Sequence, residues 1–225
     1  MRNEISEAGG GSLSVMLRII FSAGKPDVRG PAIFIDRDGV INCRRPGDYV
    51  LHWAQFLFVP GIQAALRQLA TLGLPMIVIS NQAAVGKGLL DASVLQEITA
   101  QMHQTLLADG VSFAAAYYCP HRADENCDCR KPKPGMLHRS AEDLNIDLGR
   151  SIFVGDSMTD MQAGQAAGCQ PIAFGPSLYE SPDSSPWRGS FPVARTAEDL
   201  FDVTVKCLHD RGHGIPDADT AHAPR

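Results

Sequence analysis

Short apolar runs of strand length alternate with longer apolar patterns of helical period through most of this chain. Strand-like runs occupy residues 32–36, 75–80, 114–118, 151–155 and 170–174. Between them, apolar side chains recur at helical spacing at Ile62, Ala65, Leu66 and Leu69, and again at Val94, Ile98, Met102 and Leu106. Strands that alternate with helices imply βαβ units. We therefore predict an α/β fold with a three-layer α/β/α, Rossmann-like sheet that is mainly parallel.

Three further helices are predicted in the second half of the chain. Pro134 suits the first position of a helix over 134–145, because its missing N–H has no partner there in any case. Gly168 suits the end of a helix that begins near Thr159. A last helix is expected at about 196–209, after a loop rich in proline, glycine and serine.

The length of 225 residues fits one domain with an extension at each end. We expect a single domain over residues 31–209, a flexible leader over 1–30 and a disordered tail over 210–225. The leader contains a brief apolar run that is interrupted by Arg18, so it is too short and too charged for a signal peptide. Met16 is an alternative start of translation.

The composition limits the class of partner. With 44% apolar and 20% charged residues, the chain has enough material for a core. The net charge of −5 argues against nucleic acid or an anionic membrane surface as the main partner. No apolar stretch approaches the ~20 residues of a membrane span. Six cysteines without a secretory signal favour a reducing compartment, so we expect a cytoplasmic protein. We also expect a monomer rather than an oligomer.

Polar side chains stand at the ends of three predicted strands. Asp36 and Asp38 follow the first strand, Ser80, Asn81 and Gln82 follow the second, and Gly155 and Asp156 follow the fourth. A doubly wound sheet brings such strand ends together in one crevice. Each piece taken alone also has a structural interpretation, since Asp and Gly favour turns and Ser, Asn or Asp can cap a helix.

Together these groups suit the transfer of a phosphoryl group. Asp36 can attack phosphorus, and Asp38 can give a proton to the leaving alkoxide and later take one from water. A Mg²⁺ ion held by Asp36 and Asp156 would screen the negative charges from each other. Ser80 and the amides after it can donate to phosphate oxygens, and Arg130 or Lys131 can neutralise the charge that spreads over those oxygens.

Four ordered motifs resemble those of the haloacid dehalogenase-like phosphatases: Asp36-Arg37-Asp38-Gly39-Val40, Ser80-Asn81-Gln82, Lys131, and Gly155-Asp156-Ser157-Met158-Thr159-Asp160. The resemblance implies that Asp36 is the nucleophile and Asp38 the general acid and base. It implies phosphate binding by Ser80 and Lys131. It also implies a magnesium site formed by Asp36, Asp156 and the backbone carbonyl of Asp38. Asp160 is either a further acidic site residue or a carboxylate in the first turn of a helix.

A second cluster contains three cysteines and one histidine within a short segment: Cys119, His121, Cys127 and Cys129. Three thiolates and one imidazole can enclose a structural Zn²⁺ without an open position. Free cysteines and a disulfide are the alternatives. A zinc loop over 119–131 would fix Arg130 and Lys131, which follow it directly.

This cluster resembles one branch of the superfamily, which holds heptose 1,7-bisphosphate phosphatases and histidinol-phosphate phosphatases and has little or no cap domain. The resemblance implies a magnesium-dependent phosphatase of a small metabolite, by preference D-glycero-D-manno-heptose 1,7-bisphosphate at its 7-phosphate. Histidinol phosphate and another sugar phosphate remain alternatives, and a catalytically inactive, zinc-stabilised binding module is a remote one. Ser157 departs from the branch, whose members commonly have a basic residue there.

Two arginines follow the first motif in a loop that should overhang the crevice. Arg44 and Arg45 can bind a second phosphate of the substrate, or they can be solvated surface residues. The same two interpretations apply to Lys87.

Overall fold

The computed structural model describes residues 16–21, 28–45, 47–175 and 190–212. They form a seven-stranded sheet in the order β1-β4-β3-β2-β5-β6-β7. The strands are β1 (Leu17–Ile20), β2 (Ile33–Ile35), β3 (Met76–Asn81), β4 (Ala115–Cys119), β5 (Ile152–Gly155), β6 (Gln170–Phe174) and β7 (Val193–Ala194). All neighbours pair in parallel except β1, which is antiparallel to β4.

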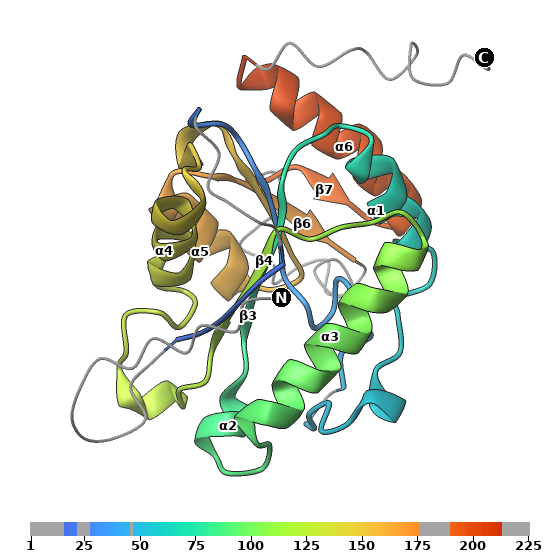
Figure 1. Ribbon diagram of the computed structural model, residues 1–225. Coiled ribbons are helices and arrows are strands. Elements are labelled where there is room, and N and C mark those ends of the chain that lie inside the picture. Colours follow the sequence, from blue (N-terminus) through green and yellow to red (C-terminus); the bar gives the residue numbers. More distant parts are fainter. Residues whose placement is uncertain (1–15, 22–27, 46, 176–189, 213–225) are drawn as a thin grey trace, which may run out of the picture.

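Helices cover both faces of this sheet (Figure 1). The helices are α1 (Ile62–Ala70), α2 (Ala83–Gly86), α3 (Ala92–Ala108), α4 (Gly135–Leu144), α5 (Met158–Ala167) and α6 (Ala197–Asp210). The helices α1, α3 and α6 pack on one face, and α4 and α5 pack on the other. Short 3₁₀ turns occur at Trp53–Gln55, Ala123–Glu125 and Leu148–Arg150. The predicted three-layer α/β/α architecture is therefore confirmed.

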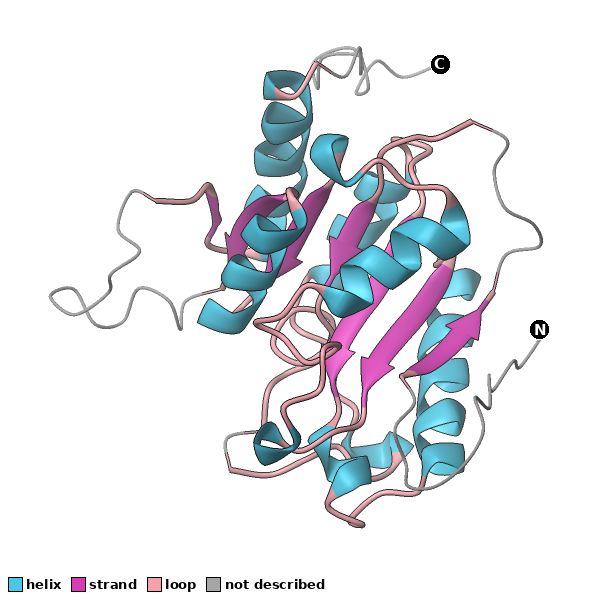
Figure 2. Ribbon diagram, turned by 90° about the vertical axis from the view of Figure 1, so that its left-hand side faces the viewer, coloured by secondary structure: helices cyan, strands magenta, loops and turns pink. Residues whose placement is uncertain are grey.

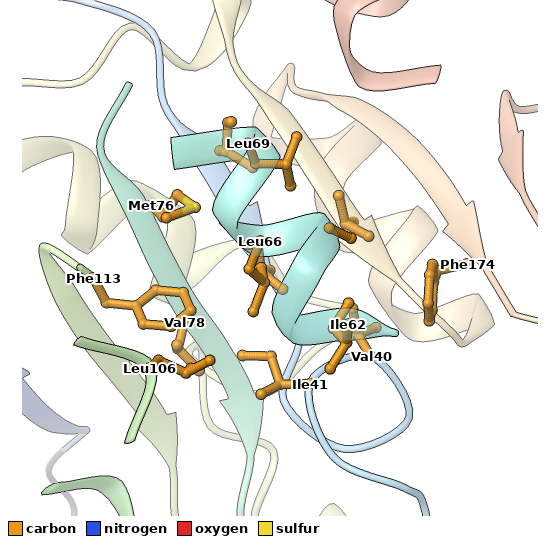
Figure 3. Close-up of a cluster of buried hydrophobic side chains, with 14 of the residues drawn as sticks. Val40, Ile41, Ile62, Leu66, Leu69, Met76, Val78, Leu106, Phe113 and Phe174 are labelled. Atoms are coloured by element: carbon orange, nitrogen blue, oxygen red, sulfur yellow. The ribbon is translucent and has the colours of Figure 1, made fainter. Parts of the chain in front are cut away.

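The central strands are buried on both faces, as parallel strands between two helix layers must be. In β2, Ile33 and Ile35 belong to the core under α1, α3 and α6, whereas Phe34 points into the core under α4 and α5. This alternation follows from the two-residue period of a strand. Figure 3 shows the first core, where Leu66 of α1 lies over the sheet near Val78 of β3.

The strand and helix predictions are confirmed for the five inner strands and for the helices they alternate with. α4 begins at Gly135, one residue later than predicted, and Pro134 takes the position just before it. Among the described elements none forms a separate cap over the sheet, in agreement with the predicted minimal cap. No helix in the described ranges has the length and apolar character needed to cross a membrane.

The prediction of a flexible leader over 1–30 is wrong for the segment that forms β1. Leu17–Ile20 adds an edge strand to β4, with Leu17 opposite Tyr118. Arg18 does not disrupt this strand because its guanidinium forms a 2.9 Å ion pair with Asp143. Residues 1–15, 22–27 and 213–225, which include most of the predicted leader and tail, lie outside the described residues.

Candidate active site

The carboxyl ends of the central strands meet at one edge of the sheet, where the arrowheads of the parallel strands point in Figure 2. Ile35 of β2 is in register with Val78 of β3 and Val154 of β5. Asp36 and Asp156 therefore leave their strands close to Ser80, at the end of β3. The crevice that the sequence predicts is present, and it forms because parallel pairing aligns these strand ends.

Three carboxylates gather at this edge of the sheet. Asp36, Asp156 and Asp160 are all buried, and their ligand oxygens lie within 4.8 Å of one another. The buried ammonium of Lys131 forms ion pairs of 2.8 Å with Asp36 and 2.6 Å with Asp160. Lys131 Nζ also donates a 3.0 Å hydrogen bond to the carbonyl of Ile79. One lysine thus faces three carboxylates, so the cluster has an excess of negative charge.

Burial and mutual repulsion make two of these carboxylates hard to ionise. Burial, only partly opposed by Lys131, raises the pKa of Asp36 to about 6. Burial and the nearby Asp36 carboxylate raise the pKa of Asp156 to about 7, although Arg44 acts in the opposite direction. A divalent cation would remove this penalty. A cluster of carboxylate oxygens is also the donor set that Mg²⁺ prefers, so the residues present fit a magnesium site.

Gly39 leaves the room that Asp156 needs. A Cβ atom on Gly39 would lie 1.8 Å from Asp156 Oδ2, and its φ of +98° is in the region that favours glycine. The glycine of the first motif therefore lets the turn after β2 approach the carboxylate at the end of β5.

Asp38 has a different environment from Asp36. Arg37 Nη2 donates to both of its oxygens at 2.9 Å, Asn42 Nδ2 donates to Oδ1 at 2.9 Å, and Gln82 Nε2 donates to Oδ2 at 2.7 Å. Burial alone would raise the pKa of Asp38, but the Arg37 charge and these hydrogen bonds outweigh it and lower the pKa. The two aspartates of one motif are thus electrostatically distinct.

Sequence reasoning placed Gln82 among the polar groups at the end of the second strand, but it assigned no individual role to Gln82, Arg37 or Asn42. Arg37 and Gln82 stand inside the motifs, beside residues that were assigned roles. All three are buried polar residues. Their signal in the sequence is therefore a polar side chain at a strand end, where burial requires a hydrogen-bond partner.

Two predicted substrate-binding residues, Asn81 and Arg130, hydrogen bond to the backbone of the cysteine-rich loop over 119–131. Asn81 exchanges two 3.1 Å hydrogen bonds with the backbone of Lys131. Arg130 Nη1 donates a 3.1 Å hydrogen bond to the carbonyl of His121. Asn81 also lines the crevice. These contacts fix the backbone that carries Lys131. Ser80 is buried, and the side-chain amide of Gln82 links it to Asp38 by hydrogen bonds to both residues.

Arg44 and Arg45 line a crevice of about 590 Å³, together with Tyr49 and Lys87. Arg44 forms a 2.8 Å ion pair with Asp156, and Arg45 forms a 2.8 Å ion pair with Asp48. The side chains of Arg44 and Arg45 are 52% and 37% exposed, so binding of a second phosphate by them stays a prediction. Lys87 Nζ donates to the Tyr49 hydroxyl at 2.9 Å across this crevice.

The position of Asp160 is compatible with both of the interpretations given for it. Its carboxylate caps the first turn of α5, where Ser157 N–H donates to it at 3.0 Å. It also lies in the carboxylate cluster beside Lys131. Ser157, the residue that departs from the branch, is thus the N-cap of α5.

The predicted zinc ligands converge. His121 Nδ1 lies 3.4 Å from Cys119 Sγ and 3.2 Å from Cys129 Sγ, and Cys127 Sγ lies 3.6 Å from each of the other two thiols. A tetrahedral ion with Zn–S bonds of about 2.3 Å has edges of about 3.8 Å. The four groups lie at nearly this spacing and fit a closed, structural zinc site. The six cysteines are free thiols, so a disulfide does not join them.

Comparisons with known proteins identify relatives of the chain. A family model described as HAD-hydrolase-like matches residues 128–199. The D-glycero-β-D-manno-heptose-1,7-bisphosphate 7-phosphatase of Vibrio cholerae is 39% identical over 145 residues, which are 61% of this chain and 77% of that protein. The chain belongs to the haloacid dehalogenase-like phosphatase family. The D-glycero-α-D-manno-heptose-1,7-bisphosphate 7-phosphatase of Mycobacterium tuberculosis is 37% identical over 64% of this chain and 78% of that protein.

Solved structures of the haloacid dehalogenase-like family agree. The D,D-heptose 1,7-bisphosphate phosphatase of B. bronchiseptica, solved with magnesium and phosphate, superposes with a TM-score of 0.69 at 31% identity. That match covers 80% of this chain and 99% of the other. A putative HAD-like phosphatase of Mesorhizobium loti has a TM-score of 0.73 at 26% identity, over 90% of this chain and 97% of that one. This chain is therefore an enzyme of the phosphoric monoester hydrolase class.

Proposed function

We propose that the protein hydrolyses a phosphomonoester of a small sugar metabolite through a phosphorylated Asp36. The observation that carries this proposal is the ion pair between Lys131 and Asp36, buried at the carboxyl end of β2. Lys131 binds one carboxylate oxygen of Asp36 and leaves the other oxygen for attack. A phosphate bound at this strand end would meet both the nucleophile and a cation.

In the first step, a carboxylate oxygen of Asp36 forms a bond to phosphorus while the bond from phosphorus to the sugar oxygen breaks. The departing oxygen takes a proton from Asp38. The negative charge of a bound phosphate raises the pKa of Asp38, which opposes the effect of Arg37. Ser80 and Lys131 bind the phosphate oxygens, and the lysine ammonium stabilises their charge in the transition state.

In the second step, water attacks the phosphorus of the aspartyl phosphate and gives its proton to Asp38. The bond between phosphorus and the Asp36 oxygen breaks, so phosphate leaves and Asp36 is restored. Asp36, Asp156 and the Asp38 carbonyl would hold a Mg²⁺ ion, which supplies charge neutralisation when it is bound. Cys119, His121, Cys127 and Cys129 would hold Zn²⁺ and fix the loop that carries Lys131.

The preferred substrate in this proposal is D-glycero-D-manno-heptose 1,7-bisphosphate, with loss of the 7-phosphate. Relatives with this activity in their names are 37–39% identical to the chain. The basic crevice supports a substrate with a second phosphate, because Arg44, Arg45 and Lys87 line it next to Asp38. Those relatives include both anomers of the heptose, so the anomer is left to experiment.

Histidinol phosphate is the second candidate substrate. The zinc loop has only five residues between His121 and Cys127, which resembles the histidinol-phosphate type. A substrate with one phosphate would not use the cationic side chains of Arg44, Arg45 and Lys87.

Release of inorganic phosphate from a panel of both heptose anomers, histidinol phosphate and other sugar phosphates tests the proposal. We expect the highest kcat/KM on a heptose 1,7-bisphosphate, and no measurable turnover by Asp36→Asn. Substantial activity of Asp36→Asn would exclude Asp36 as the nucleophile. A strong preference for histidinol phosphate would instead overturn the substrate assignment and leave the chemistry intact.

A further inference from the structure

Gln82 bridges two polar groups of the active-site crevice. It follows β3 directly, is 3% exposed, and its Nε2 donates hydrogen bonds of 2.7 Å to Asp38 Oδ2 and 3.1 Å to Ser80 Oγ. Its backbone N–H donates a 2.7 Å hydrogen bond to the carbonyl of Cys119, at the end of β4. The backbone of Gln82 is therefore held by the sheet itself, and its side chain starts from a fixed position.

Asp38 has less support of its own. It lies on the turn after β2, and its side chain is 29% exposed at the crevice. The 2.9 Å hydrogen bonds from Arg37 to both of its oxygens come from a single nitrogen of the adjacent residue in the chain. Asn42, four residues along, is on the same turn. Both donors belong to the same segment after β2 as Asp38, and neither is on β3, although the Arg37 guanidinium also interacts with Tyr118 of β4.

Gln82 differs from these donors because it reaches Asp38 from another strand. It joins the carboxylate to the strand end that carries Ser80, the residue that binds the phosphate in the proposed function. A proton donor acts only when it lies within hydrogen-bond reach of the leaving oxygen. The side-chain amide of Gln82 therefore links Asp38 to Ser80, and so to a substrate phosphate bound by Ser80.

We propose that Gln82 is a positioning residue that fixes Asp38 relative to the phosphate bound at Ser80, so that the proton reaches the leaving oxygen. This inference rests on the proposed function, because it uses the role of Asp38 as the general acid. Gln82 itself does not take part in bond making or breaking. Its loss should therefore affect only those substrates whose leaving group needs a proton.

The test compares two leaving groups in Gln82→Met. One substrate is the sugar phosphate that the wild-type enzyme hydrolyses fastest, whose alkoxide must be protonated. The other is 4-nitrophenyl phosphate, whose phenolate leaves as a stable anion. The parameter is kcat/KM, which covers only the steps up to departure of the leaving group and excludes hydrolysis of the aspartyl phosphate.

We expect kcat/KM for the sugar phosphate to fall by about 30-fold, part of the ~10²- to 10⁴-fold that a general acid contributes. For 4-nitrophenyl phosphate we expect a fall of less than about threefold. Equal losses on both substrates would show that Gln82 serves phosphate binding through Ser80 or general stability, and would overturn the proposal. Unchanged or increased activity on the sugar phosphate would overturn it as well.

A second variant guards against loss of folding. Gln82→Glu keeps the shape of the side chain but, when ionised, donates no hydrogen bond to Asp38, and we expect the same difference between the two substrates. Gln170→Met is the matched control, since Gln170 is half-buried at the start of β6 and its side-chain amide donates a 3.1 Å hydrogen bond to the neighbouring carbonyl of Pro171. It should leave both activities unchanged. Activity that survives Asp36→Asn would defeat the proposed function, whichever result Gln82 gives.

Discussion

The ammonium group of Lys131 lies 2.8 Å from the carboxylate of Asp36, and both side chains are almost fully buried. The two residues come from distant parts of the sequence, β2 and the end of the zinc loop. Lys131 reaches Asp36 because Asn81 holds its backbone from β3. The position of the Asp36 carboxylate is thus linked to the order of the cysteine-rich loop.

Lys131→Met should remove most of the activity and lower the stability. We expect kcat to fall by ~10²- to 10³-fold, as when one donor to a transition-state oxyanion is removed. The free energy of unfolding should fall by about 3 kcal/mol, because Asp36 and Asp160 lose a buried partner. Phosphate release and urea unfolding measure these effects. Lys206→Met, an exposed change on α6, should alter neither; full activity of Lys131→Met would contradict the assigned role.

The stability of the metal-free protein should depend on pH through Asp156. Its pKa is raised from 3.8 to about 7 by burial and by Asp36, so it binds a proton more tightly in the folded state. The folded protein therefore loses stability from this group as the pH rises from about 4 to about 7.

We expect Asp156→Asn to have a higher free energy of unfolding than the wild type. This difference should be about 2 kcal/mol larger at pH 7.5 than at pH 5. Urea unfolding of metal-free protein at both pH values measures this. Asp202→Asn, which changes an exposed carboxylate on α6, is the control and should show no such difference. A constant effect of Asp156→Asn across this range would show that Asp156 carries no burial penalty.

Arg44 should compete with magnesium for Asp156, because its guanidinium forms the 2.8 Å ion pair with that carboxylate. Arg44→Met should therefore bind Mg²⁺ about two- to fivefold more tightly, since a half-exposed ion pair contributes up to about 1 kcal/mol. Calorimetric titration with MgCl₂ in the absence of substrate measures the affinity. Arg45→Met should have the wild-type affinity, because Arg45 pairs with Asp48. Weaker binding by Arg44→Met would indicate that Arg44 supports the metal site.

Cys127→Ser should release zinc and loosen the loop that carries Lys131. We expect less than half an equivalent of zinc by elemental analysis, a lower melting temperature and reduced kcat, since metal binding supplies the order of the loop. Cys43→Ser is the control: Cys43 lies outside the zinc cluster and its thiol contacts only the carbonyl of Phe58 at 3.6 Å. Full zinc content in Cys127→Ser would remove Cys127 from the ligand set.

The inner strands and the helices could be predicted because their signals are local. A run such as Ile33–Ile35 is wholly apolar, as a strand covered on both faces requires. β1 escaped prediction because Arg18 interrupts a short run, and its charge is neutralised by Asp143, which is far away in the sequence. β7 has only two residues, too few for a pattern.

The sequence by itself determined the order of the elements, the carboxylates at the strand ends and the clustering of three cysteines with one histidine. These follow from the period of apolar residues and from residue types at short spacing. The tertiary structure alone decided what each polar group contacts. It placed Arg44 on Asp156, Asn81 on the Lys131 backbone and Gln82 between Asp38 and Ser80. Apart from Gln82 and Ser80, which are two residues apart, these partners are separated widely along the chain. They meet only when parallel pairing aligns the strand ends, so no local pattern reveals them.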